Sequence, residues 1–221
     1  MTYDPMGVLL PAACALLVDV GLGVGLRFAW GDPWFLALIP AAVVARPVLQ
    51  APFRAAMLAA GARAVRPDAD AGVLASVRVA FVDAVRGIVS AVVAGAVLVP
   101  VALVGSWLAT RGLYLFAAIF VAAGLVFAAT AALLVRAVLA YAPVDVVVGR
   151  CGAFEALGRS WTTLSADVAV TALFLLAGDV STGLGGALCA AGALPGYPLA
   201  ELALVSRWAA RQPAISAPSA A

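Results

Sequence analysis

The chain has 221 residues, of which 66% are hydrophobic and 11% charged, and its mean hydropathy is +1.13. A soluble domain is usually about 45–50% apolar and about 25% charged, so this composition excludes a water-soluble globular fold and indicates a membrane protein. The formal net charge is only +2, which gives no electrostatic basis for binding nucleic acid.

Six apolar stretches predict an all-α, polytopic membrane bundle. A spanning helix needs about 20 mostly apolar residues, because the hydrocarbon core is about 30 Å thick. The six stretches form a single transmembrane domain over residues 1–212, and residues 213–221 are predicted to be a disordered tail. The first stretch is longer than the apolar region of a signal peptide, so we expect a span rather than a removed leader. The predicted spans are residues 7–30, 34–50, 87–109, 113–135, 166–188 and 194–210.

Spans 2 and 3 are separated by a long stretch, residues 51–86, which is predicted to lie outside the membrane. It holds five arginines and three aspartates. Apolar residues recur at helical spacing from Val73 to Ala84, with Arg78, Asp83 and Arg86 on the other side. This pattern is typical of an amphipathic helix that lies at the membrane surface and leads into span 3.

A second amphipathic helix is predicted before span 5, over residues 150–164. Phe154 and Trp161 belong to one apolar stripe at helical spacing, and Glu155 and Arg159 lie on the opposite side as an i,i+4 pair. Tryptophan suits the interface because its ring is apolar and its N–H is polar. We therefore expect the aromatic residues to face the membrane or the bundle, and Arg159 to face water or lipid headgroups.

The arginines predict the orientation. If the N-terminus is cytoplasmic, eleven of the thirteen arginines lie on cytoplasmic segments or the adjoining span ends, and only Arg27 and Arg111 lie outside. Cytoplasmic loops of membrane proteins carry an excess of basic residues. The sequence therefore predicts a multi-pass protein of the cell membrane with both termini in the cytoplasm.

The two amphipathic segments form a weak internal repeat, in which each precedes an apolar hairpin and contributes an aromatic residue, an acid and an arginine. Repeat units suit a transporter or a scaffold equally. The alternative is that any amphipathic entry helix shows this pattern. Small-residue spacings such as Ala91-xxx-Gly95 and Gly124-xxx-Ala128 are compatible with close helix packing.

The segment before the last hairpin carries a family resemblance. Its matching residues are Glu155, Ala156, Leu157, Arg159, Ser160 and Trp161, preceded by the run Tyr141-Ala-Pro-Val-Asp-Val. In this motif the chain resembles a prokaryotic superfamily of six-span membrane proteins, archaeal ones among them, related to the membrane domain of some glycerophosphodiester phosphodiesterases. The resemblance covers residues 70–210 at most. It implies fold and topology only, because this chain has no phosphodiesterase domain and most members are uncharacterised.

Three carboxylates fall inside predicted spans and are the candidate polar site: Asp19, Asp179 and Glu201. A carboxylate in the hydrocarbon core costs several kcal/mol unless it is protonated, paired or hydrated. Asp19 is therefore either a proton or ion site or a packing contact with an arginine or serine of a neighbouring helix. Asp179 lies either in a helix break between Gly178 and Gly183 or close to the outer surface. Glu201 is expected to meet an arginine of another span or the surroundings of Asp19.

Catalysis is not expected. Without histidine or lysine, the candidate general bases are a few carboxylates, and no serine or cysteine has a visible base partner. Cys14, Cys151 and Cys189 are widely spaced, so we expect no disulfide framework, metal site or cofactor. The sequence favours a non-catalytic scaffold, accessory or lipid-interacting component, with the bilayer and a second copy or another membrane protein as partners. The alternative is a small-molecule or ion permease that uses the intramembrane carboxylates.

Overall fold

The computed structural model describes residues 5–33, 35–63, 69, 71–163, 168–188 and 190–211. Every regular element in these ranges is a helix, which confirms the all-α class. The predicted tail, residues 213–221, lies outside the described residues. The helices are α1 (Pro5–Phe28), α2 (Phe35–Ala62), α3 (Val73–Thr110), α4 (Tyr114–Val138), α5 (Ala142–Val147), α6 (Ala153–Thr163), α7 (Val168–Leu188) and α8 (Ala190–Arg211).

Three segments of the described chain are long and apolar enough to cross a membrane: Pro5–Phe28, Val73–Thr110 and Tyr114–Val147. A shorter apolar helical stretch covers Val168–Ser181. These segments agree with a membrane protein. The helix bounds differ from the predicted spans chiefly around residues 51–86, where α2 continues to Ala62 and α3 already begins at Val73.

Helix α3 joins the predicted surface helix and the predicted third span into one element of 38 residues. At about 1.5 Å per residue it is roughly 57 Å long, almost twice the thickness of the hydrocarbon core. The helix continues through Pro100 and ends at a Schellman-type turn, in which Leu113 N–H donates to the carbonyl of Leu108 and Gly112 N–H to that of Ala109. Gly112 adopts a φ of +76°, a conformation in which a side chain would be strained.

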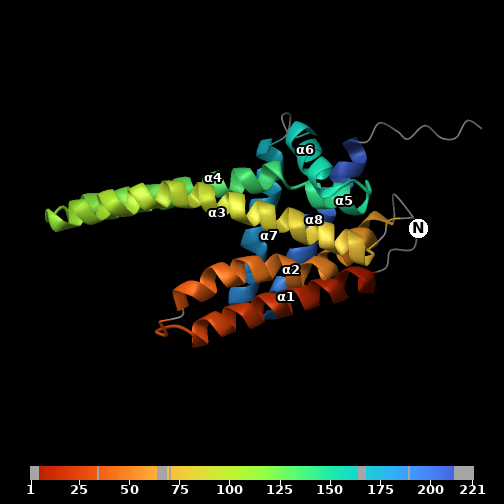
Figure 1. Cartoon of the computed structure of the whole chain (residues 1–221), viewed down its shortest axis with the longest axis horizontal. Coiled ribbons are helices and arrows are strands. Elements are labelled where there is room, and N and C mark those ends of the chain that lie inside the picture. The colour runs from red at the N-terminus through yellow and green to blue at the C-terminus, as the bar shows by residue number, and fades with distance from the viewer. Residues whose placement is uncertain are drawn as a thin grey trace, which may run out of the picture.

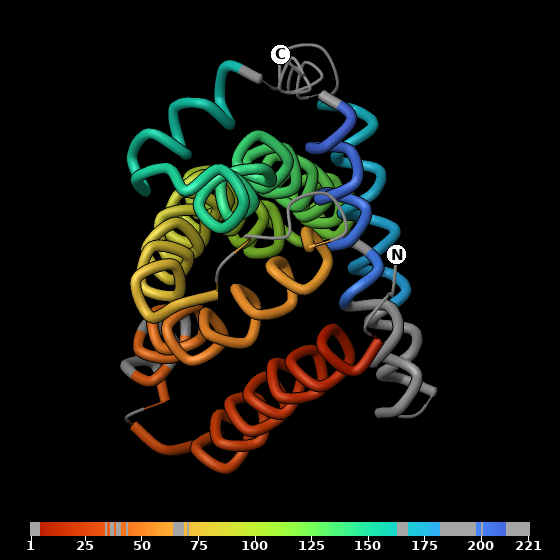
Figure 2. Tube along the Cα trace, turned by 90° about the vertical axis from the view of Figure 1, so that its right-hand side faces the viewer, coloured from red at the N-terminus to blue at the C-terminus, as the bar shows by residue number. Residues whose placement is uncertain are grey.

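Consecutive helices pack side by side: α1 against α2, α2 against α3, and α3 against α4. The α3–α4 hairpin extends well beyond the turn that joins α1 to α2 (Figure 1). The hairpin of α7 and α8 crosses this row of four helices instead of running parallel to it (Figures 1 and 2). Along this crossing α7 contacts α4, while α8 contacts α5, α2 and α1.

Close approach of α3 and α4 depends on glycine. A Cβ added at Gly124 would lie 2.5 Å from both Cγ atoms of Val101, and one added at Gly105 would lie 2.6 Å from Val121 Cγ2. Gly124 and Ala128, one of the two small-residue spacings in the sequence, are both buried. The other spacing makes no such contact, because a Cβ added at Gly95 would meet nothing within 4 Å.

The main buried core lies at one end of the row. It joins the second half of α2, the first half of α3, the end of α4, all of α5, and the facing sides of α6, α7 and α8. All six residues of α5 are buried. The far halves of α3 and α4 instead expose apolar side chains such as Leu103 (66%), Leu115 (71%) and Phe127 (65%), as expected of lipid-facing positions.

Candidate functional site

Asp19 on α1 is held by Arg46 on α2. The guanidinium binds the carboxylate through two atoms, with Nε 2.7 Å from Oδ1 and Nη2 3.0 Å from Oδ2. Both residues lie well inside their helices, and the side chains are 26% and 58% exposed on the surface of the chain. Of the two interpretations of Asp19, this geometry matches the packing contact with an arginine of a neighbouring helix.

Asp179 on α7 is held in the same manner by Arg136 at the end of α4. Nη1 of Arg136 lies 2.5 Å from Oδ2, and Nη2 lies 3.2 Å from Oδ1. Helix α7 is continuous through Gly178 and Asp179 and ends only at Leu188, so it contains no helix break at this carboxylate. The pair connects α4 to α7 at a partly exposed position.

Glu201 on α8 belongs to a buried group of charges, the α2–α3–α8 network, formed by Arg54, Asp83, Arg86 and Glu201. Arg54 Nη2 lies 2.6 Å from Glu201 Oε1, and Arg54 Nη1 also binds Asp83 Oδ1. Arg86 Nη2 lies 3.4 Å from the same Asp83 oxygen. The Arg54 side chain is only 5% exposed, and each of the other three is at most 15% exposed. Two positive and two negative charges meet here, so the network is neutral.

The three predicted carboxylates are therefore not brought into one site. Each binds a different arginine that belongs to another helix than its own: Asp19 binds Arg46 of α2, Asp179 binds Arg136 of α4, and Glu201 binds Arg54 of α2. The described residues contain no group of three or more acidic or cysteine side chains placed to hold a metal ion. Chemically, the arrangement neutralises the charges and connects helices in pairs.

Two buried polar contacts near α5 were missed by sequence reasoning. The indole Nε1 of Trp208 on α8 donates a hydrogen bond to Asp145 Oδ1 on α5 at 2.6 Å, with both residues buried. The hydroxyls of Tyr141 and Thr171 lie 3.4 Å apart between the end of α4 and α7, also buried. The only signal for Asp145 was its place in the apolar run after Tyr141, where a lone carboxylate must find a donor.

Helix α6 has a buried side that differs from the predicted stripe. Ala156 and Ser160 are fully buried, and Ser160 Oγ donates to the carbonyl of Val138 at 2.8 Å. Phe154 and Trp161 are instead 79% and 69% exposed on the surface of the chain. The ring of Phe154 contacts that of Phe81 on α3, edge to face, with centroids 5.2 Å apart.

The charged pair of α6 lies where the helical spacing predicts it. Arg159 Nη2 is 2.6 Å from Glu155 Oε1, and both side chains are more than half exposed. The small residues face the bundle because they allow α6 to approach the end of α4 closely. The large aromatic side chains consequently remain on the outer surface.

Comparison with protein-family models, with curated proteins and with solved structures finds no match to this chain. The resemblance to the six-span prokaryotic superfamily stays a prediction.

Proposed function

We propose that this chain is a multi-pass protein of the cell membrane that acts as a non-catalytic scaffold, accessory subunit or lipid-interacting component. The observation that carries the proposal is the pairing of every candidate carboxylate with an arginine of another helix. A carboxylate that carries protons or cations must exchange them, whereas a carboxylate bound by a guanidinium already has a cationic partner. The pairs are best explained as connections between helices.

The proposed orientation places the core end of the row in the cytoplasm. The arginines of the α2–α3–α8 network, together with Arg136 and Arg159, belong to this end. The turns at the opposite end carry Arg27 and Arg111, so the asymmetry of basic residues favours a cytoplasmic core. Both termini are then cytoplasmic, whether the chain has four spans or six.

The sequence and the packing favour different span counts. The apolar length of α7 and α8 favours six spans, with these helices as the third hairpin. Their crossing of the α1–α4 row (Figure 1) favours four, and the α7–α8 hairpin would then lie along the cytoplasmic side of the membrane. The connection between Leu188 and Ala190 distinguishes the two, because it is external only in a six-span protein.

The exposed side of α6 supports the lipid-interacting role. Phe154 and Trp161 present apolar area on the outer surface of α6, and the same helix carries the exposed guanidinium of Arg159. This combination suits the headgroup region, where aromatic rings bury their apolar faces and arginines meet phosphates. The Asp19–Arg46 pair supports a protein partner. An ion pair exposed to lipid tails costs free energy unless a second copy of the chain or another membrane protein covers it.

Reconstitution tests the proposal against the permease alternative. We expect liposomes that contain the purified chain to pass protons, sodium and chloride no faster than protein-free liposomes, and Asp19→Asn to leave the rates unchanged. The measurement is ion-sensitive dye fluorescence under an imposed gradient. Flux that depends on the protein and disappears in Asp19→Asn, with circular dichroism unchanged, would make the chain a permease.

A charge exchange supplies the matched control. Asp19→Arg alone places two arginines together and should lower stability, whereas combining it with Arg46→Asp restores the pair in reverse. Recovery of stability in the double variant is expected of a connection between helices. A transport site would not regain its flux on such an exchange.

A further inference from the structure

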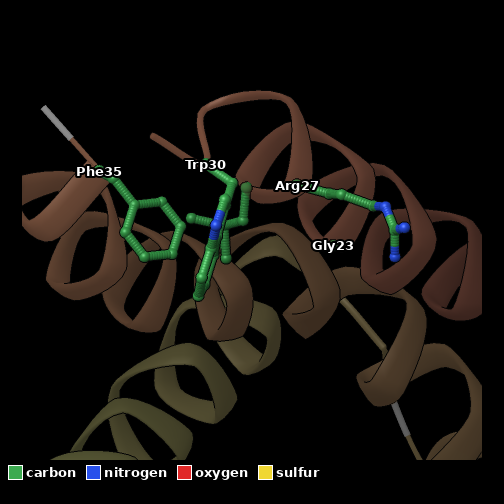
Figure 3. A pocket seen from close by; sticks show the side chains of 5 residues that line it. Gly23, Arg27, Trp30 and Phe35 are labelled. Atoms are coloured by element: carbon green, nitrogen blue, oxygen red, sulfur yellow. The ribbon is translucent and has the colours of Figure 1, made fainter. Parts of the chain in front are cut away.

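The turn between α1 and α2 forms a cleft, and none of the residues that line it belongs to the ion pairs described above. Its volume is about 660 Å³, and it is lined by Gly23, Leu26, Arg27, Trp30 and Phe35. Figure 3 shows Trp30 and Phe35 next to each other on one side and Arg27 on the other. We propose that this cleft binds the headgroup of an anionic phospholipid, with phosphate on Arg27 and the glycerol and upper acyl chain against Trp30 and Phe35.

The turn between the helices holds the aromatic wall in place. Three consecutive backbone hydrogen bonds of 3.0–3.3 Å form this turn. Ala29 N–H donates to the carbonyl of Gly25, Trp30 N–H to that of Arg27, and Asp32 N–H to that of Ala29. Gly31 supplies the left-handed residue that this turn needs, with a φ of +93°. The rings of Trp30 and Phe35 then meet edge to face with centroids 4.9 Å apart, which fixes their position relative to Arg27.

Arg27 is available to a ligand. Its guanidinium makes no ion pair or side-chain hydrogen bond with the described part of the chain, in contrast to Arg46, Arg54 and Arg136. It belongs to the last turn of α1, where the helix carbonyls favour a cation. A guanidinium can donate two parallel hydrogen bonds to a phosphate, so the ligand is expected to be a phosphate monoanion.

The surface of α1 that precedes Arg27 is suited to contact an acyl chain. Leu17, Val20 and Val24 recur at helical spacing on α1 and are 70%, 56% and 46% exposed, forming an apolar stripe that ends at Arg27. From position 17 to position 27 the stripe rises about 15 Å, half of the hydrocarbon core. Cβ atoms added at Gly21, Gly23 and Gly25 would meet nothing within 4 Å, so backbone is open to contact along the same length. A cleft at headgroup depth above a half-membrane apolar stripe matches a phospholipid rather than a free anion.

The inference rests on the proposed membrane location but not on the absence of transport, so its failure would leave the flux result standing. The test uses the full-length chain in detergent, with native mass spectrometry to measure binding of phosphatidylglycerol and phosphatidylcholine. We expect the wild-type chain to prefer phosphatidylglycerol about five- to tenfold, the effect of one arginine near a headgroup of net charge −1, because the choline ammonium of phosphatidylcholine neutralises its own phosphate. Arg27→Gln should abolish the preference for phosphatidylglycerol, and Arg27→Lys should retain part of it. Trp30→Ala should weaken the binding of both lipids.

Arg111 offers the matched control. It lies at the other outer turn with its guanidinium 5.5 Å from the centre of the Trp107 ring, and Arg111→Gln should leave the phosphatidylglycerol preference intact. Equal loss in both arginine variants would show a general charge effect and overturn the site. An unchanged preference in Arg27→Gln would overturn it as well. Displacement of the lipid by inorganic phosphate at comparable concentration would replace the lipid with a free anion.

Discussion

Arg54→Met should lower the free energy of unfolding by about 3–5 kcal/mol, the usual cost of breaking a buried ion pair from one side. The substitution preserves much of the side-chain volume. It removes the guanidinium that binds both Asp83 and Glu201, whose side chains are at most 13% exposed. Unfolding in detergent by titration with sodium dodecyl sulfate, followed by circular dichroism, measures the change.

Two controls isolate the buried charges as the cause. Arg159→Met removes an arginine from the exposed pair with Glu155 and should cost only about 0.3–0.5 kcal/mol. The double variant Arg54→Met and Glu201→Met removes one charge of each sign, leaves Asp83 paired with Arg86, and should recover most of the stability, because no uncompensated charge remains. If the double variant is less stable than Arg54→Met, the network stabilises the fold beyond neutralising its own charges.

Trp208→Phe should destabilise the chain by about 1–3 kcal/mol, because it removes the donor that Asp145 uses while keeping an aromatic ring in place. Asp145→Asn is the matched variant. It removes the negative charge of the carboxylate, but the side-chain oxygen of asparagine can still accept the hydrogen bond from the indole N–H. We expect Asp145→Asn to cost less than Trp208→Phe in the same unfolding assay. The opposite order would show that the carboxylate charge matters more than the hydrogen bond.

Helix content could be read from the sequence because apolar runs of membrane length leave the backbone few alternatives. The turns at Gly31 and Gly112 accordingly fall in the gaps between the predicted spans 7–30 and 34–50 and between the predicted spans 87–109 and 113–135. The packing of the charged residues between positions 51 and 86 could not be predicted, because arginines and aspartates in such a stretch indicate a solvated surface. Arg54, Asp83 and Arg86 instead bury one another between helices, and such pairing depends on which helices meet in space.

The partners of the candidate carboxylates could be anticipated only as a class. An arginine partner was one of the alternatives for Asp19 and Glu201, but the sequence could not choose among thirteen arginines. On α6 the helical spacing correctly predicted the Glu155–Arg159 pair. The side of the helix that is buried consists instead of small residues. Ser160 and Ala156 allow contact with the end of α4 that Phe154 and Trp161 would block.

Cysteine accessibility in intact cells tests the proposed topology most directly. In a background with Cys14, Cys151 and Cys189 replaced by alanine, single cysteines are introduced as Asp32→Cys in the α1–α2 turn and Arg63→Cys after α2. Both positions are exposed. The account predicts that a membrane-impermeant maleimide labels Asp32→Cys from outside and reaches Arg63→Cys only after permeabilisation. Labelling of Arg63→Cys in intact cells, with Asp32→Cys protected, would reverse the orientation, and labelling of both would contradict α2 as a membrane span.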